Sequence, residues 1–279
     1  MLTTNIPVLD YIPEIIKQIS RGGQALLYLA RLRYGRLVVI KYFYNQTSFE
    51  REAFILGCLD HSHIIKLLAY SKYFGQPSLV LDYFPGNNFA HLLNFIFKND
   101  KHLGPSLISY FCYQLLNILA YLERRHIVHA DLAAENILVN SFGFIRLCDF
   151  ASSRSYYNLE ETTLCGRKDF LAPEILLGLK PTHWSDLYAL GAILFEATVR
   201  RRYNINNRES DLKELRYILR EYPDRIYYLI SSCLSYSVWH RPASAAEALL
   251  RFGYINIKRA QAEITDLLKH ANWAHPEFS

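Results

Sequence analysis

The chain has 279 residues, of which 51% are hydrophobic and 20% are charged, a balance typical of a globular protein and not of a disordered one. The formal net charge of +5 is too small to indicate nucleic-acid binding by itself. The longest apolar helical segment, residues 187–199, contains Glu196 and is too short to span a bilayer, so we expect no membrane span.

The cysteines and the N-terminus indicate the compartment. Five cysteines are scattered without a CxxC pair, and four of them stand in apolar sequence, which predicts reduced core thiols: Cys58, Cys112, Cys148 and Cys233. Residues 1–10 lack a basic region followed by an apolar run, so no signal peptide is expected. We therefore expect an intracellular protein, cytoplasmic or nuclear.

The first third of the chain favours strands. Two apolar runs, residues 26–33 and 36–43, flank Tyr34-Gly35 and predict a hairpin. An amphipathic helix is expected over residues 48–59, and residues 79–81 predict a short buried strand that ends at Pro85-Gly86.

Beyond this turn the pattern becomes helical. Apolar residues recur at helical spacing over residues 106–124. Further helices are expected over residues 184–198, 211–220, 225–233 and 243–250. The architecture implied is a small sheet-bearing lobe and a larger helical lobe, with a ligand cleft at their connector.

Two acids and an amide are grouped in the middle of the chain. Residues 137–140 and 144–148 read as paired strands joined by a turn, which brings Asn136 alongside Asp149, with Asp131 in the loop just before. Hard oxygen ligands of this kind suit magnesium bound to phosphate. The remaining acid, Asp131, can orient a hydroxyl nucleophile. The alternative is that each acid only caps a turn, as Asp and Asn commonly do. That would explain a single acid but not the spacing of the whole set.

With these positions in place, the chain resembles the eukaryotic-type protein kinases from about residue 19 to residue 250. Residues 19–28 resemble the glycine-rich hairpin that covers phosphate, and residues 38–41 resemble the strand with the nucleotide-binding lysine. Residues 166–174, which end in Ala-Pro-Glu, resemble the substrate-facing loop. The resemblance implies an α+β, bilobal fold, with residues 1–84 as the N-lobe, 85–253 as the C-lobe and 254–279 as a C-terminal tail.

The resemblance also implies roles for single residues. Lys41 would position ATP and be held by Glu52; Asp131 would be the catalytic aspartate that orients the acceptor hydroxyl; Asn136 and Asp149 would bind Mg²⁺. The remaining implied nucleotide contacts are Ser20, Gly22, Gly23, Ala25, Leu27, Val39, Leu81, Asp82, Phe84 and Leu138. Asp186 and the pair Glu174 and Arg241 would hold the helical lobe.

Several positions depart from the family pattern. Ser20 and Ala25 replace two glycines of the phosphate loop, which predicts weaker nucleotide affinity. Ala130 replaces the arginine that receives an activation-loop phosphate, so regulation through that phosphate loses its charge partner. Ala133 and Glu135 stand where serine/threonine and tyrosine kinases, respectively, place a cation. We hypothesise that Arg167 supplies this charge; the alternative is that Arg167 contacts Asp131 and blocks the substrate site.

Three functions follow from this resemblance. The leading prediction is a protein kinase. Serine and threonine are its expected substrate residues, because Phe170 stands where tyrosine kinases usually have Trp. The alternative is a pseudokinase, a nucleotide-binding or scaffolding module that binds a protein partner. Small-molecule phosphotransferases share the spacing of the acids but lack the Ala-Pro-Glu loop and its arginine partner, so Glu174 and Arg241 argue against that class.

Overall fold

The computed structural model of the protein describes residues 6–21, 25–73, 76–155 and 170–269. The chain divides into two compact units. The first, here called the strand-rich unit, comprises Met1–Phe84 and Cys148–Ser153; the second, the helical unit, comprises Pro85–Leu147 and Arg154–Ser279. The α+β class, with a strand-rich and a helical part, is as predicted from the sequence.

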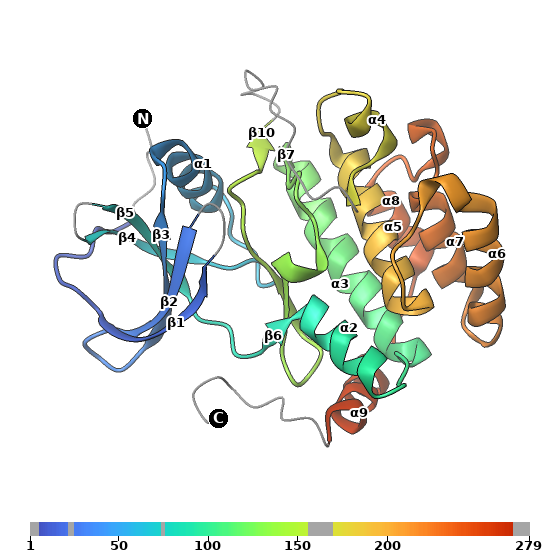
Figure 1. Ribbon diagram of the computed structural model, residues 1–279, viewed down its shortest axis with the longest axis horizontal. Coiled ribbons are helices and arrows are strands. Elements are labelled where there is room, and N and C mark those ends of the chain that lie inside the picture. The colour runs from blue at the N-terminus through green and yellow to red at the C-terminus, as the bar shows by residue number, and fades with distance from the viewer. Residues whose placement is uncertain (1–5, 22–24, 74–75, 156–169, 270–279) are drawn as a thin grey trace. The chain divides into compact units, whose positions relative to one another are not determined.

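The strand-rich unit contains an antiparallel five-stranded sheet in the order β1-β2-β3-β5-β4 (Figure 1). Its strands are β1 (Glu14–Arg21), β2 (Ala25–Arg31), β3 (Leu37–Phe43), β4 (Leu67–Tyr73) and β5 (Gln76–Asp82). Helix α1 (Gln46–Gly57) packs against β3, β4 and β5. The side chain of Asn45 accepts a hydrogen bond from the N–H of Ser48, which satisfies an amide that the first turn of α1 leaves unpaired.

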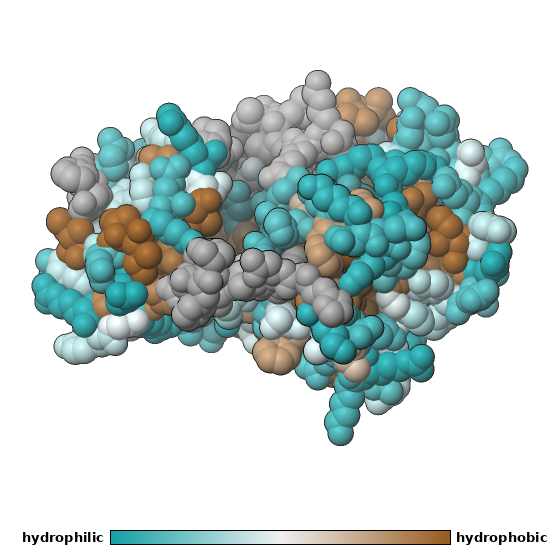
Figure 2. Space-filling view, turned by 60° about the horizontal axis from the view of Figure 1, so that its bottom comes forward, coloured by the Kyte–Doolittle hydropathy of each residue, from teal (hydrophilic) through white to brown (hydrophobic). Residues whose placement is uncertain are grey.

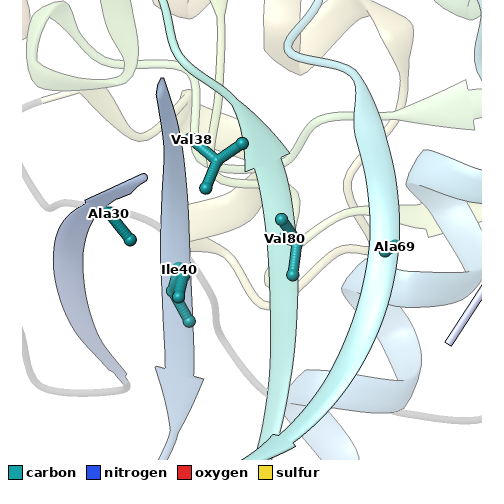
Figure 3. Packing of buried hydrophobic residues seen from close by; sticks show 5 residues of the cluster. All are labelled: Ala30, Val38, Ile40, Ala69 and Val80. Carbon is teal, nitrogen blue, oxygen red and sulfur yellow. The ribbon is translucent and has the colours of Figure 1, made fainter. Parts of the chain in front are cut away.

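One face of this sheet holds a small apolar core. Figure 3 shows its five members, which approach one another from adjacent strands: Ala30, Val38, Ile40, Ala69 and Val80. Because side chains alternate across a strand, Val39 and Lys41 lie on the opposite face of β3 from Val38 and Ile40. The packed face therefore fixes which side chains β3 presents on the other face, where Lys41 lies.

Apolar side chains also reach the surface of the strand-rich unit, as the brown patches in Figure 2 show. The exposed large apolar residues of its first strands and the segment before them are Val8, Ile12, Ile16 and Ile19. Cys58, expected to be a core thiol, is exposed, because it follows the last turn of α1 instead of lying on its packed face. Cys112 and Cys233 are buried.

The helical unit is built around α3 (Pro105–Arg124) and α5 (His183–Val199), and most residues of both helices are buried. The other helices are α2 (Phe89–Lys98), α4 (Pro173–Leu176), α6 (Arg208–Ile218), α7 (Asp224–Cys233), α8 (Ala245–Phe252) and α9 (Ile257–Leu268). Its short strands form two small sheets: β6 (Asn87–Asn88), β8 (Ile137–Val139) and β9 (Ile145–Leu147), and β7 (Ile127–Val128) with β10 (Arg154–Ser155). No helix among the described residues is long and apolar enough to cross a membrane.

The C-terminal helix α9 is docked on α3 (Figure 1). Side-chain hydrogen bonds satisfy backbone groups at the start of α3 and at the end of α9. The first residue before α3 is Gly104, which has no side chain to cap the helix, and the carboxylate of Glu263 on α9 instead accepts from the N–H of Leu107 at 2.8 Å. In return, the ammonium of Lys101 donates to the carbonyl of Leu267 at the end of α9 at 2.8 Å. Helix α9, which lies in the segment expected to be a C-terminal tail, thus belongs to the packed structure of the helical unit.

Replacing Glu263 with alanine is expected to lower the free energy of unfolding by about 1–2 kcal/mol, because it removes both a helix cap and a negative charge at the N-terminus of α3. Urea unfolding followed by circular dichroism measures this loss. Lys258→Ala, an exposed change on the same helix, is the control and should change the midpoint little. Equal midpoints for Glu263→Ala and the control would show that α9 does not stabilise α3 through this cap.

Candidate active site

Lys41 and Glu52 form a buried ion pair within the strand-rich unit. Lys41 lies on β3 and is 5% exposed, and Glu52 lies on the inner face of α1 and is fully buried. Their Nζ and Oε2 atoms are 2.6 Å apart. Burial of both charges is tolerated because each supplies the other with a charged hydrogen-bond partner.

Asp149 binds the same lysine. Its Oδ1 lies 2.8 Å from Lys41 Nζ. The backbone of Asp149 is left-handed, with φ of 64°, and the next residues turn back through a hydrogen bond from the N–H of Ser153 to the carbonyl of Phe150. Arg51, beside Glu52 on α1, donates to the carbonyl of Ala151 at 3.2 Å, so α1 holds this segment as well as the lysine.

These contacts set the charges of the cluster. Burial alone would lower the pKa of Lys41, but the carboxylates of Glu52 and Asp149 raise it above its ordinary value, so the ammonium stays charged at neutral pH. Burial raises the pKa of Glu52, while Lys41 opposes this rise. The cluster therefore holds one charged ammonium between two acids.

The other acid and the amide of the predicted site, Asp131 and Asn136, lie in the helical unit. The Nδ2 of Asn136 donates to the backbone carbonyl of Asp131 at 2.8 Å and to its Oδ2 at 3.3 Å. Asn136 ends a short 3₁₀ turn, Ala134–Asn136, that leads directly into β8. Since the amide nitrogen is used within the loop, a metal ion at Asn136 would be met by the amide oxygen.

The hairpin after Asn136 is held by a buried glutamine that sequence reasoning did not identify. Gln114 on α3 is fully buried; its Nε2 donates to the carbonyl of Gly143 at 2.8 Å and its Oε1 accepts from the N–H of Ile145 at 3.0 Å. The sequence does contain a signal for this role, because Gln114 is an amide on the apolar stripe of the helix predicted over residues 106–124. A buried amide there must have hydrogen-bond partners.

Asp186 organises the loop before Asp131. Its two carboxylate oxygens accept from the N–H groups of His129 at 2.8 Å and Ala130 at 3.0 Å. Ala130 has a left-handed backbone, with φ of 62°, which is unfavourable for alanine and is maintained here by its hydrogen bond. Burial raises the pKa of Asp186 to about 7, although these two amides lower it.

Asp186→Asn is expected to destabilise the protein by about 1–3 kcal/mol, because an amide offers one acceptor oxygen where two N–H groups need one each. The loss should depend on pH. Because folding raises the pKa of Asp186 from about 3.8 to about 7, its contribution to stability is full below pH 4 and declines as pH rises to 7. The difference in thermal midpoint between wild type and variant should therefore shrink over that interval. A difference that stays constant from pH 4 to pH 7 would contradict this assignment.

The expected nucleotide contacts of the strand-rich unit lie mostly on one face of its sheet. Leu27 pairs with Lys41, and Val39 pairs with Leu81, so these four side chains project from one face of the sheet. The next residue, Asp82, projects from the other face, where it forms an ion pair with Arg36 at 2.9 Å.

The remaining positions are placed as follows. Ser20 lies on β1, Ala25 begins β2, Phe84 is buried at the end of the unit, and Leu138 lies half-buried on β8 of the helical unit. Gly22, Gly23 and Arg167 lie outside the described residues, as do the candidate phosphosites of residues 156–163.

The oxygen donors fit magnesium in kind. Among the described residues no cluster of three or more His, Cys, Asp or Glu side chains could hold a metal by protein ligands alone. Magnesium bound with phosphate needs only one or two carboxylate or amide oxygens from the protein. Asp149 supplies one such group, and its side chain is 43% exposed, so a ligand can reach it.

Comparison with known proteins agrees with this geometry. Residues 14–255 match the model of the protein kinase domain family. The chain is 30% identical over 195 residues to Aurora/IPL1-related protein kinase 2 of Caenorhabditis elegans, covering 67% of this chain and 63% of that protein. It is 31% identical over 196 residues to an Aurora kinase of Schizosaccharomyces pombe, covering 67% and 54%.

A bacterial relative is similar to the same degree. The probable serine/threonine-protein kinase PknB of Lactococcus lactis is 32% identical over 199 residues, which cover 66% of this chain and 31% of that protein. The chain thus spans less than two thirds of the length of these relatives. Since the family model covers most of the sequence, the chain belongs to the protein kinase family.

Proposed function

We propose that this protein transfers the γ-phosphoryl group of ATP to a serine or threonine hydroxyl of a protein substrate. The observation that carries the proposal is the double pairing of Lys41, whose Nζ is 2.6 Å from Glu52 and 2.8 Å from Asp149. Burying a charged lysine costs desolvation free energy that an apolar side chain in the same place would not. This cost supports a role of the cation in binding phosphate. The alternative, a pseudokinase that binds nucleotide or a partner without transfer, keeps the fold but has no need of Asp131.

Each of the proposed site residues would have its own task. Lys41, held by Glu52, would neutralise charge on the bound phosphates. Asn136 and Asp149 would hold Mg²⁺, which when bound spreads the negative charge of the phosphates. Leu27, Val39, Leu81 and Leu138 would contact the nucleotide through apolar surface.

Asp131 would orient the attacking hydroxyl and accept its proton. Its position supports this role, because the amide of Asn136 bonds both its carbonyl and its carboxylate and so fixes the direction of the side chain. The loop is held from the other side by Asp186 through the N–H of Ala130. The preference for serine and threonine rests on Phe170, which is buried in front of α4 and covered by the guanidinium of Arg202, 4.5 Å from the ring centre.

The missing cation beside Asp131 is assigned to Arg167. Ala133 is fully buried and Glu135 is acidic, so neither can stabilise charge on the phosphoryl group. We expect Arg167→Ala to slow transfer by about 10²–10³, the usual cost of losing one stabilising group in a transition state. Unchanged transfer by this variant would exclude Arg167 from the reaction.

Product analysis tests the proposed specificity. The protein is incubated with γ-³²P-ATP, magnesium and a mixed protein substrate, and the labelled products are hydrolysed to single amino acids. Phosphoserine and phosphothreonine are expected. Label found mainly in phosphotyrosine would contradict the assignment from Phe170, and no label at all would favour the scaffolding alternative.

A further inference from the structure

A groove of about 1300 Å³ lies on the helical unit, lined by residues of α6, α7, α8 and the short 3₁₀ turn Val238–His240. Pockets for small ligands usually measure about 300–1,000 Å³. The groove is larger than this range and open, which suits an extended segment of another chain better than a small molecule. None of the residues proposed for phosphoryl transfer lines it.

The rim of the groove is aromatic. Tyr228, Tyr236 and Trp239 line it with their side chains exposed, and Trp239 is 81% exposed. Its floor is apolar and buried, formed in part by Leu229 and Phe252. Exposed tryptophan and tyrosine above a buried apolar floor are the residue types that carry most binding energy in protein interfaces.

The charge of the groove is positive. Arg208 donates from Nε to the carbonyl of Leu234, and Arg225 donates to the carbonyls of Phe252 and Tyr254. In the part of the chain that the structure describes, neither guanidinium forms an ion pair with a carboxylate, and the Nε of Arg225 is buried without a hydrogen-bond partner. The carbonyls of Leu234 and Phe252 lie at the C-terminal ends of α7 and α8 and carry only partial negative charge, so a net positive charge remains.

The other charges in the groove largely cancel. Arg251 forms an ion pair with Glu247, and Arg241 forms one with Glu174. Arg208 and Arg225 therefore leave a surplus of two positive charges beside an aromatic rim. A partner carboxylate would complete their hydrogen bonding in a partly desolvated place, where such bonds are stronger than on an open surface.

We propose that this groove binds an acidic segment of a partner protein, with its Asp or Glu carboxylates on Arg208 and Arg225 and an apolar side chain against Trp239. This surface goes beyond the proposed phosphoryl transfer and requires neither nucleotide nor turnover. It would select partners by charge and by the spacing between their acidic and apolar residues.

Fluorescence anisotropy without ATP tests the proposal. The probe is a fluorescein-labelled twelve-residue peptide that repeats Glu-Glu-Leu, and the comparison peptide repeats Lys-Lys-Leu. We expect the acidic peptide to bind at least about tenfold more tightly than the basic one, and binding to weaken when NaCl is raised from about 0.1 M to about 0.5 M. Trp239→Ala and Arg208→Gln should each weaken binding by about tenfold.

Matched variants separate this surface from general effects. Tyr34→Ala removes an exposed aromatic ring from the strand-rich unit, and Arg259→Gln removes an exposed arginine from α9; both should bind like the wild type. Trp239→Glu places a negative charge on an exposed rim position and should abolish binding while the thermal midpoint stays unchanged. This variant keeps the test valid even where Arg208→Gln fails to fold.

Four results would overturn the proposal. Equal affinity for the acidic and basic peptides would exclude charge selection, and full binding by Trp239→Glu would exclude the groove. Binding that appears only when the peptide carries phosphoserine would assign the arginines to phosphate instead. Self-association of the protein that Trp239→Glu abolishes, seen by analytical ultracentrifugation, would assign the groove to a second copy of the chain.

Discussion

Replacing Arg241 with methionine is expected to lower the free energy of unfolding by about 3–5 kcal/mol, because it leaves the largely buried carboxylate of Glu174, 11% exposed, without a counter-charge. The guanidinium is fully buried and meets both oxygens of Glu174, at 2.7 and 2.8 Å. It also donates to the carbonyls of Ser235 and Trp184, and lies 4.9 Å from the centre of the Tyr188 ring. The side chain thereby ties α4 to α5 and to the segment between α7 and α8.

Denaturant unfolding measures this effect, with Arg251→Met as the matched control. Arg251 also pairs with a glutamate, but on the surface, where its side chain is 76% exposed, and such pairs contribute about 0–1 kcal/mol. The double variant Arg241→Met with Glu174→Leu should recover part of the loss, since it removes the unpaired charge as well. Similar midpoints for Arg241→Met and Arg251→Met would show that the buried pair does not hold the helical unit.

Replacing Lys41 with methionine is expected to abolish detectable phosphoryl transfer and also to destabilise the strand-rich unit. The change leaves Glu52 fully buried without its partner, and removing one member of a buried pair costs about 3–5 kcal/mol. Burial raises the pKa of Glu52, and without Lys41 to oppose it the rise is larger. The stability of the variant should therefore be greatest at low pH, where the carboxyl is protonated, and fall as pH rises above the ordinary pKa of a glutamate.

Thermal unfolding from pH 4 to pH 8 checks this dependence, and Lys41→Met with Glu52→Gln is the control. The double variant has no ionisable group in the pair, so the added pH dependence should disappear while transfer remains absent. Substantial transfer by Lys41→Met would contradict the proposed role of the lysine. A variant whose stability loss is the same at every pH would contradict the assigned state of Glu52.

Elements with strong local patterns were predictable from the sequence. The long apolar stripe of residues 106–124 is found as α3, and the two apolar runs that flank Tyr34-Gly35 are found as β2 and β3. Strand β1 was not predicted as an element, because its side chains are mostly exposed and polar residues interrupt its alternation. Helix α2 was missed because its apolar residues follow one another closely, which leaves strand and helix hard to distinguish from periodicity.

The site could be predicted only in part. The sequence indicated Lys41, Glu52 and Asp149 through the order of family motifs, but only the structure gives the pairing of one lysine with both acids. The contacts of Gln114 with Gly143 and Ile145 could not be predicted, because hydrogen bonds between residues about thirty positions apart depend on packing and not on local pattern. The same holds for Glu263, whose carboxylate caps a helix that begins more than 150 residues earlier in the chain.

The proposal that Asp131 directs phosphoryl transfer is tested most directly by single-turnover transfer from γ-³²P-ATP with excess enzyme. Asp131→Asn keeps the size of the side chain, while Asp60→Asn changes an exposed acid of the strand-rich unit and serves as the control. We predict that the wild type and Asp60→Asn transfer label at equal rates, and that Asp131→Asn, with an unchanged thermal midpoint, transfers it at least about 10²-fold more slowly. Equal rates for the wild type and Asp131→Asn, or no transfer by the wild type, would contradict it.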